Sequence, residues 1–304
     1  MAVFDCFTFF NELDLLELRL REMNEAVDRF VIVEAPWTFR GDPKPLFFAE
    51  NKERFSAFLN KIIHVVVHDE IETDDPWARE KLQRDAIRRG LADAKPDDTI
   101  IVSDVDEILK PRAIREAVAY GALCHFDQSV HHYFLDLVKP DAYWAHAFAI
   151  PARLLRYMTH IGEARAAEQW ALYERLNMPY HVIRDAGWHF TWIGQPERIR
   201  EKLGAYSHSE PEYERCRDED VLAKAIRARR FALNDGRLAL ADFATLPVSV
   251  QARADEMLEF GLLSGPANAR RMLARLWDGV VLAKLWAKGR RLRMRDFPRA
   301  LQAS

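Results

Sequence analysis

The sequence predicts an α/β fold built on a doubly wound, mostly parallel sheet. First, strand and helix patterns alternate four times within the first hundred residues, which is typical of such sheets. Second, the stretch 99–103 is a short apolar and β-branched run with aspartates on both sides, as expected of a buried central strand. Third, 304 residues with 49% apolar content suffice for one large α/β domain with a helical appendage.

The elements of the first half follow from local patterns. Residues 2–10 are apolar and aromatic, and predict the first strand. A helix should follow, because apolar residues recur at helical spacing at Leu13, Leu16, Leu20, Met23 and Val27. The charged residues between them, Arg19 included, are expected to face solvent. Further strands are expected at 30–33, 61–67 and 99–103, and helices at 51–59 and 77–94.

The second half should contain shorter strands and several helices. Its strands are predicted at 123–126, 130–138, 143–150, 181–184 and 187–193. Its helices are predicted at 111–120, 195–207, 211–230 and 267–288.

Composition and charge exclude several classes of protein. The net charge of −3 gives no global basic field, so no nucleic-acid partner is expected. The three cysteines, Cys6, Cys124 and Cys216, are far apart and indicate neither a metal site nor a disulfide framework, which fits a reducing compartment. The sequence contains neither a GxGxxG nor a Walker A motif. A cytoplasmic location is expected, because the N-terminus does not read as a signal peptide and no apolar run approaches the roughly 20 residues of a membrane span.

Two aspartates follow the predicted central strand at positions i and i+2. If the backbone stays extended, Asp104 and Asp106 project to the same side, and paired carboxylates at a strand end suit Mg²⁺ or Mn²⁺ with a substrate diphosphate. The same spacing at Asp218 and Asp220 lies in a polar, helical stretch, where a solvated helix face is the better interpretation. The position of the first pair after a buried strand favours the metal site.

Other polar residues are expected at the same edge of the sheet, because ligands of open α/β sheets bind beyond the carboxyl ends of the strands. The predicted strands end there, and the helix over 77–94 begins there. The edge residues expected to bind substrate are Asn11, Glu12, Glu34, Gln83 and Arg84. For Arg84 an ion pair with Glu80, four residues earlier, is an equally weighted alternative.

Five stretches occur in an order that resembles a known family. They are residues 10–20, 30–35, 80–90, 103–108 and 186–189, and a similar helix and turn at 219–236 ends the likeness, which starts near residue 4. Together they resemble glycosyltransferase family 17. Five motifs in order are far more specific than the aspartate pair alone.

This resemblance implies a GT-A-like fold and a metal-dependent, inverting glycosyltransferase. The expected donor is a UDP-sugar, with UDP-GlcNAc as the first choice, the expected cofactor is Mn²⁺ or Mg²⁺, and the acceptor is a glycan hydroxyl. The resemblance also implies that His189 is a third metal ligand, that Glu34 lies near the nucleoside and that Arg84 approaches the diphosphate. Residues 1–236 would form the catalytic domain, and 237–304 a helical, basic extension.

The catalytic base and a sugar-stacking residue are expected near the motif at 186–189. Asp185 is the first candidate for the base, with Asp136 and Glu163 as alternatives, and each has an ordinary surface acid as its competing interpretation. Trp188 or Trp192 is expected to stack on a sugar ring, with core packing as the alternative.

The last forty residues suggest a different role. Ten Lys or Arg stand against two Asp over residues 265–304, and the amphipathic pattern at 267–288 suits an anionic membrane surface or, equally, packing on the main domain. A membrane contact would place the enzyme at the inner membrane face, with a lipid-linked glycan as acceptor. Two rival functions remain open: a phosphohydrolase or nucleotidyltransferase that uses the same aspartates, and a non-catalytic membrane-surface binding protein.

Overall fold

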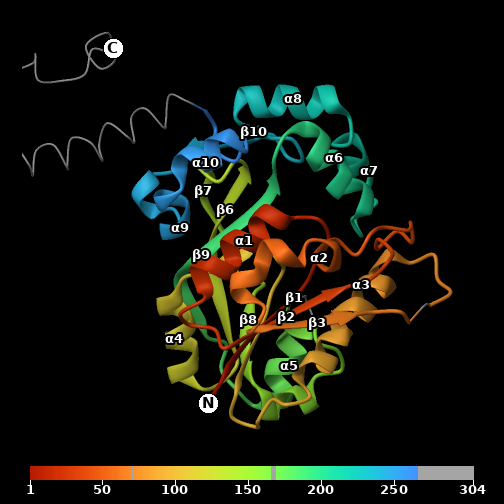
Figure 1. The fold of residues 1–304 in the computed structure, drawn as a ribbon, viewed down its shortest axis with the longest axis vertical. Coiled ribbons are helices and arrows are strands. Elements are labelled where there is room, and N and C mark those ends of the chain that lie inside the picture. Colours follow the sequence, from red (N-terminus) through yellow and green to blue (C-terminus); the bar gives the residue numbers. More distant parts are fainter. Residues whose placement is uncertain (70, 166–168, 266–304) are drawn as a thin grey trace, which may run out of the picture.

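One large sheet crosses the molecule in the computed structural model, which describes residues 1–69, 71–165 and 169–265 (Figure 1). Its strands are β1 (Val3–Thr8), β2 (Arg29–Glu34), β3 (Ile62–Val66), β4 (Thr99–Val102), β5 (Glu107–Leu109), β6 (Cys124–Tyr133), β7 (Leu137–Trp144), β8 (Phe148–Pro151), β9 (Val182–Ile193) and β12 (Ala239–Leu240). A separate small ribbon pairs β10 (Arg230–Phe231) with β11 (Gly236–Arg237). The basic helix predicted at 267–288 lies outside the described residues.

The helices connect and cover these strands. The α-helices are α1 (Leu13–Met23), α2 (Phe47–Glu50), α3 (Pro76–Asp85), α4 (Pro111–Tyr120), α5 (Gln169–Leu176), α6 (Pro196–Ala205), α7 (Pro211–Arg215), α8 (Glu219–Ala228), α9 (Val248–Ala252) and α10 (Ala254–Glu259). The 3₁₀ segments are η1 (Lys52–Phe58), η2 (Ala86–Leu91), η3 (Ala152–Tyr157), η4 (Glu163–Arg165) and η5 (Phe243–Thr245). None of the described helices has the length and apolar character needed to cross a bilayer.

The strand order confirms the predicted α/β class with a doubly wound sheet. Strands β3, β2, β1 and β4 lie side by side and are all parallel. Beyond β4 the sheet continues through β8, β6, β7 and β12 with antiparallel pairings, and β9 runs parallel to β6 on its other flank. The first hundred residues therefore build the parallel half, as their alternating pattern predicts.

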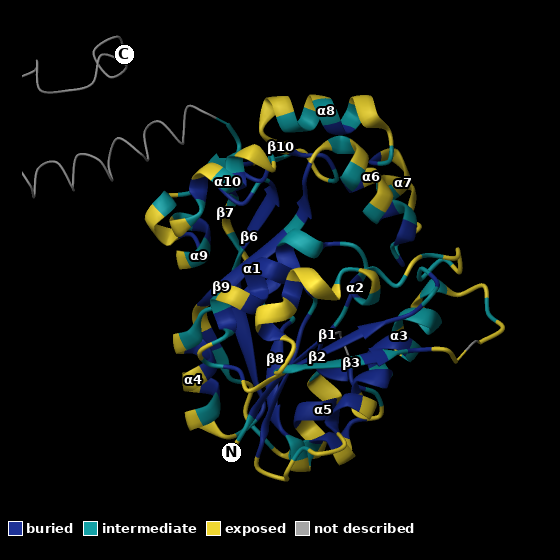
Figure 2. Ribbon diagram, in the orientation of Figure 1, coloured by how far each residue is buried: buried dark blue, intermediate teal, exposed yellow. Residues whose placement is uncertain are grey.

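Each face of the sheet has its own hydrophobic core. Along β1, Val3 and Phe7 belong to the core under α1, whereas Phe4 and Cys6 belong to the core under η2 and α5. This alternation follows from the two-residue period of side chains in a strand. Buried residues concentrate in the central strands, and exposed ones lie on the outer sides of the helices (Figure 2).

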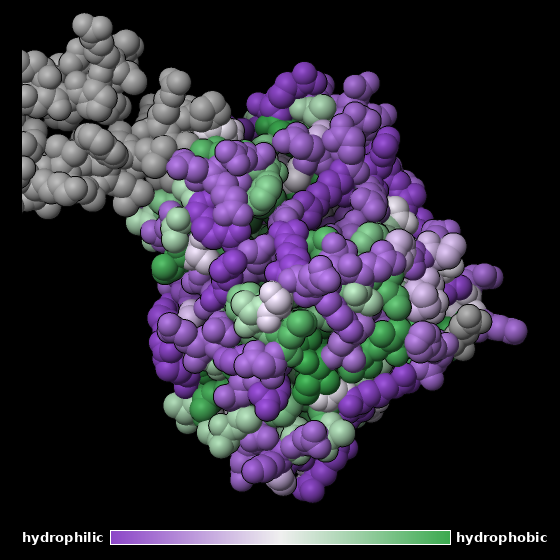
Figure 3. Space-filling view, viewed as in Figure 1, coloured by the Kyte–Doolittle hydropathy of each residue, from purple (hydrophilic) through white to green (hydrophobic). Residues whose placement is uncertain are grey.

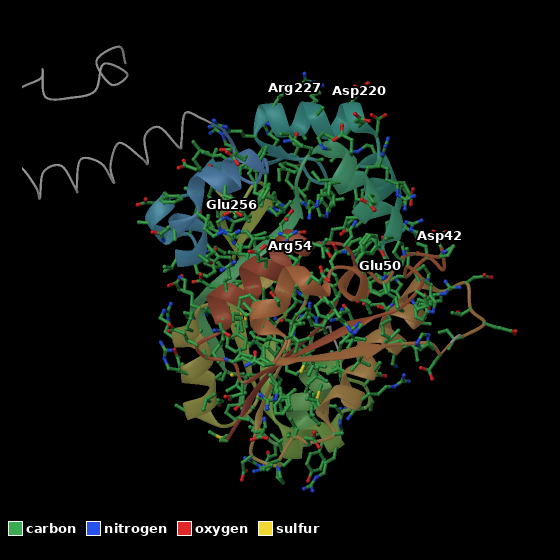
Figure 4. All side chains as sticks on the ribbon, viewed as in Figure 1. Asp42, Glu50, Arg54, Asp220, Arg227 and Glu256 are labelled. Atoms are coloured by element: carbon green, nitrogen blue, oxygen red, sulfur yellow. The ribbon has the colours of Figure 1, made fainter. Side chains whose placement is uncertain are left out.

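A third, smaller core lies under α6 and α8. It contains Tyr133 and Trp192 from the ends of β6 and β9, packed with Leu203 and Leu222 of the two helices. The outer side of α8 is polar, and Asp220 and Arg227 project from it into solvent (Figure 4). The face in Figure 3 is hydrophilic over these helices and hydrophobic near β1 and β2.

Several predicted element boundaries are wrong. The strands predicted at 181–184 and 187–193 form a single strand, β9, whose pairing with β6 shifts register between them. The helix predicted at 211–230 is two helices, because the Asp218 carboxylate accepts hydrogen bonds from the Asp220 and Val221 amides and starts α8 as its N-cap. Asp220 itself is exposed, as its interpretation as a solvated residue predicted.

Arg19 does not face solvent, contrary to its place in the helical pattern. It is fully buried, with Nε 2.7 Å and Nη2 2.5 Å from the two Asp5 carboxylate oxygens. Its Nη1 donates to the carbonyl oxygens of Asp104 at 2.8 Å and Glu107 at 2.7 Å, and Nη2 donates to Ser103. A buried guanidinium needs all its donors satisfied, and this one joins α1 to the turn after β4.

On the other side of the turn after β4, strands β5 and β9 approach each other closely. Gly187 of β9 pairs with Leu109 of β5, and a Cβ at position 187 would lie 2.1 Å from the Ile108 carbonyl oxygen. The absence of a side chain at Gly187 lets the two backbones meet. Two residues further along, His189 then stands opposite Glu107.

We expect Arg19→Met to destabilise the fold strongly. The substitution leaves the Asp5 carboxylate buried without its charged partner, which typically costs 3–5 kcal/mol in the free energy of unfolding. Urea unfolding measures this change. Arg21→Met is the matched control on the same helix: its ion pair with Glu17 involves a side chain that is 45% exposed, so a change below about 1 kcal/mol is expected.

The free energy of unfolding should also fall on mild acidification. Burial lowers the pKa of His131 to about 4 and of His132 to about 3, from 6.5. Between these values and 6.5 the unfolded chain binds more protons than the native state, so stability decreases as pH falls through this window. Urea unfolding from pH 7 to 4.5 should show a shallower decrease for His132→Phe than for wild type. An equal decrease would contradict the prediction, and His68→Gln, at an exposed histidine, is the control.

Candidate active site

A cavity of about 530 Å³ lies at the carboxyl ends of the parallel strands. Its walls come from the residues after β1, the loop at 37–39, helix α3 and the turn after β4. Further walls come from the end of β7 and residue 146, the segment 160–165, the second half of β9, and the segment from α6 to His208. This is the edge at which the sequence places substrate. Of the predicted site residues, those that line the cavity are Glu12, Gln83, Arg84, Asp104, Asp106 and His189.

Asp104 is held by two arginines. Arg84 Nη1 donates to Oδ1 at 2.9 Å, and Arg165 Nη2 donates to Oδ2 at 2.6 Å. Burial opposes ionisation of Asp104, but the charges of Arg165 and Arg84 outweigh it and hold the pKa of the carboxyl well below its usual range. Arg84 also donates to Glu80 at 2.8 Å, so the ion pair expected from the sequence is present.

Asp106 faces a lysine and a histidine. Lys202 Nζ donates to Oδ2 at 2.7 Å and lies 3.0 Å from Glu12 Oε1, while His189 Nε2 is 3.7 Å from Asp106 Oδ1. Burial opposes protonation of Lys202, but Asp106 and Glu12 outweigh it and raise the pKa of the ammonium above its usual value. The aspartate, the histidine and the lysine thus share one corner of the cavity.

Glu107 stabilises the turn after β4 through buried hydrogen bonds. It is fully buried, and its Oε2 accepts the Asp104 amide at 2.7 Å and Arg165 Nη1 at 2.6 Å. The indole of Trp144 donates to its other oxygen, Oε1. Burial opposes ionisation, but Arg165 holds the pKa of Glu107 below its usual value. Glu107 therefore orients an arginine and a tryptophan of the cavity as well as the backbone of Asp104.

Three aromatic rings form a stack along one wall. The Trp144 ring lies 4.0 Å from the His146 ring and 4.5 Å from the His189 ring, centroid to centroid, with interplanar angles of 27° and 26°. All three residues line the cavity. Since the Trp144 indole is also anchored by Glu107, this wall presents a fixed aromatic surface.

Residues 206–208 form another wall of the cavity, and several contacts join them to Arg40 and to helix α3. Arg40 donates to the carbonyl oxygens of Tyr206 at 3.1 Å and His208 at 2.8 Å. Ser207 Oγ donates to Glu80 at 2.6 Å, and the Trp77 and His208 rings meet edge to face at 4.8 Å. We call residues 206–208 the strap; it joins the end of α6 to the first turns of α3.

The donor chemistry of the Asp104–Asp106 corner fits a hard divalent cation in part. Carboxylate oxygens and an imidazole nitrogen converge there, and Asp106 Oδ1 accepts no hydrogen bond from the described residues. However, no three His, Cys, Asp or Glu side chains among the described residues are arranged as a ready metal cluster. The remaining carboxylate oxygens are paired with arginine and lysine, so a metal ion would have to displace at least one of these pairs.

Four predicted site residues do not line the cavity: Asn11, Glu34, Trp188 and Asp185. Glu34 is buried and accepts the Phe48 and Ala49 amides at 3.1 and 3.0 Å, so it serves the start of α2. Trp188 points to the opposite face of β9 from His189, and its indole donates to the Thr245 carbonyl at 2.9 Å. Asn11 borders a smaller hollow next to the cavity.

The proposed base, Asp185, also lies away from the cavity. Its side chain is 71% exposed and pairs with Lys110 and Arg112, both at 2.5 Å. The alternatives do not line the cavity either: Asp136 accepts hydrogen bonds from Ser264, and Glu163 accepts one from the Thr159 amide. We therefore assign the base role to none of these three acids.

Sequence reasoning missed four residues that shape the site. Glu107 and Trp144 carry a weak signal, since one adjoins the aspartate pair and the other is an aromatic in a strand pattern. Arg165 and Lys202 carry no local signal, because each is an ordinary cation in its own stretch of sequence. They reach the aspartates only through the tertiary path of η4 and α6.

Curated proteins similar to this chain include glycosyltransferases of mammals. The chain is 26% identical over 255 residues to a protein of Rattus norvegicus named β-1,4-mannosyl-glycoprotein 4-β-N-acetylglucosaminyltransferase, and 26% identical over 254 residues to the protein of that name in Homo sapiens. Each match covers 71% of this chain and 46% of the relative. The matched region thus spans about half the length of these relatives.

Solved structures with similarity to this chain include a mannosyltransferase and a synthase. One is mannosyltransferase PcManGT from Pyrobaculum calidifontis in complex with GDP-Man and Mn²⁺, at a TM-score of 0.42, with 13% identity over 93% of this chain and 80% of that one. Another is glucosyl-3-phosphoglycerate synthase from Mycobacterium tuberculosis, at a TM-score of 0.39, with 12% identity over 74% and 79%.

The family assignment rests on the sequence. The family model described as Glycosyltransferase family 17 matches residues 1–229, which is most of the chain and includes every cavity residue up to His208. The chain belongs to glycosyltransferase family 17.

Proposed function

We propose that this protein is an inverting, metal-dependent glycosyltransferase that moves GlcNAc from UDP-GlcNAc to a glycan hydroxyl, on a GT-A-like fold. The observation that carries the proposal is the position of Asp104 and Asp106, which meet Arg84, Arg165 and Lys202 in a cavity of about 530 Å³. That volume lies in the range of small-molecule and cofactor sites. Family membership and the names of the relatives support the choice of reaction and of GlcNAc.

The cations of the cavity suit a diphosphate. Arg84 and Arg165 each present a planar fork of donors, which matches phosphate oxygens, and Asp104 holds both forks in place. Asp104, Asp106 and His189 would hold a Mn²⁺ or Mg²⁺, and the bound ion would stabilise the negative charge that develops on the departing UDP.

The aromatic residues at the two ends of the cavity suit the other parts of the substrates. Trp37, Phe39 and Trp77 line one end, beside α3, and offer ring faces to a nucleoside. The stack built on Trp144 lies next to Asp106 through His189 and offers a flat surface to a sugar ring. We place the donor nucleoside at the first end and the transferred sugar or acceptor at the second.

The reaction proposed for this arrangement is a single displacement. The acceptor oxygen forms a bond to the anomeric carbon on the face opposite UDP, the bond from that carbon to the diphosphate oxygen breaks, and the hydroxyl proton passes to a base in the cavity. Arg84 and Arg165 then face the leaving diphosphate, which gains one negative charge as this bond breaks. Positioned cations of this kind act most strongly where water is excluded.

Asp104→Asn and Asp106→Asn should each lower turnover of UDP-GlcNAc at least a hundredfold, because each removes a charge that holds the metal or the arginines. In thermal unfolding, UDP with Mn²⁺ should stabilise the wild type, by about 2.7 kcal/mol at 100 times the dissociation constant, and neither variant. Asp185→Asn is the control and should keep most of the activity. Stabilisation by UDP in both variants, or release of phosphate in place of UDP, would contradict the proposal.

Arg165→Lys should lower kcat/KM for the donor by about ten- to a hundredfold. One ammonium cannot reproduce the fork that joins Asp104 to Glu107, so both the phosphate contact and the shape of the turn suffer. Steady-state kinetics with UDP-GlcNAc measure the effect. Arg175→Lys, at the ion pair with Glu163 outside the cavity, should change kcat/KM less than twofold, and equal losses in the two variants would argue against a role for Arg165.

A further inference from the structure

Lys202 occupies a position that the proposed reaction leaves unexplained. It belongs to α6, almost a hundred residues after Asp106, yet its ammonium lies between the carboxylates of Asp106 at 2.7 Å and Glu12 at 3.0 Å. Its side chain is mostly buried and lines the cavity. Glu12, just before α1, and Asp106, after β4, thus share one ammonium group.

The surrounding charges make this lysine different from the arginines. The acids of the corner are Glu12, Asp104, Asp106 and Glu107, and the cations bonded to them are Arg84, Arg165 and Lys202. Both arginines are engaged with Asp104 or Glu107. Lys202 forms the ion pairs with Asp106 and Glu12, and its compact charge sits on a flexible four-carbon stem.

A divalent cation on Asp106 would meet this ammonium at close range. Oδ2 of Asp106 is taken by Lys202, and Oδ1 faces the Nε2 atom of His189 at 3.7 Å. An ion bound between Oδ1 and His189 would lie a few ångströms from the lysine charge, and like charges at that distance in a partly buried site repel strongly. A diphosphate bound at the same time would supply negative charge for both cations.

We infer that Lys202 is an exchangeable counter-ion, which pairs with Asp106 as long as no metal ion is bound and moves to the diphosphate when the metal ion and the nucleotide bind together. The inference rests on the proposed function, which supplies the metal and the diphosphate. A metal ion that binds alone must compete with the Lys202 ammonium for Asp106. When a diphosphate binds together with the metal ion, the ammonium gains a new negatively charged partner. Binding of the two ligands is therefore positively coupled, and the coupling is reciprocal.

The test is calorimetric titration of Mn²⁺ into the full chain, with and without saturating UDP. Lys202→Met should bind Mn²⁺ alone at least tenfold more tightly than the wild type. UDP should tighten Mn²⁺ binding at least tenfold in the wild type and less than threefold in the variant. Lys202→Arg keeps the charge and should bind Mn²⁺ alone as weakly as the wild type.

Two controls make the result specific. Lys81→Met removes a lysine that lines the same cavity but forms no ion pair with the described acids, and it should leave Mn²⁺ affinity within twofold of the wild type. Asp106→Asn should abolish the Mn²⁺ binding that Lys202→Met strengthens. Thermal unfolding of each variant verifies folding, and Lys202→Gln replaces Lys202→Met if the latter fails to fold.

The inference is overturned if Lys202→Met binds Mn²⁺ no more tightly than the wild type, if no Mn²⁺ binds to either protein, or if UDP tightens Mn²⁺ binding equally in both. Failure of the proposed function looks different. In that case UDP would bind to no protein with any divalent metal, while the comparison of Mn²⁺ alone between wild type and Lys202→Met would still measure the competition by the lysine.

Discussion

The site depends on one buried arginine that need not touch substrate. Arg19 lies inside the parallel half of the fold, between the Asp5 carboxylate of β1 and the carbonyl oxygens of Asp104 and Glu107. Burying a guanidinium is costly unless all its donors are bonded, so this set of acceptors must form together. Once it has formed, the backbone after β4 has little freedom, and the carboxylates of Asp104 and Asp106 are directed into the cavity.

The parallel half of the fold could be predicted from the sequence because its signals are local. Alternating strand and helix patterns predicted the four parallel strands β1 to β4. The rule that ligands bind at the carboxyl ends placed Glu12, Gln83, Arg84, Asp104 and Asp106 at one edge. The second half was less predictable, because its strands are paired by register over long sequence separations. The interruption between 184 and 187 suggested two strands, whereas a register shift lets one strand continue.

The errors at the site have physical causes of the same kind. Adjacent residues of a strand face opposite sides, so His189 and Trp188 could not both line the cavity, and the pairing of β9 with β5 and β6 decides between them. Glu34 does end a strand at the correct edge, but its carboxylate accepts hydrogen bonds from the backbone amides at the start of α2. Arg165 and Lys202 could not be identified from the sequence, because their contacts with the aspartates are made across 61 and 96 residues and leave no local pattern.

The strap at residues 206–208 connects two walls of the cavity that come from distant parts of the sequence. The turn that holds the arginines depends on β1, α1, β4 and β5, whereas the opposite wall comes from α6 and the strap, fastened by Arg40, Ser207 and Trp77. These contacts are at least partly buried, and Ser207 itself is almost completely buried. Glu80 joins the two walls, because one of its carboxylate oxygens accepts a hydrogen bond from Ser207 and the other accepts one from Arg84. Arg84 in turn holds Asp104, so a substitution in the strap would be transmitted to the turn after β4 and would alter both sides of the cavity.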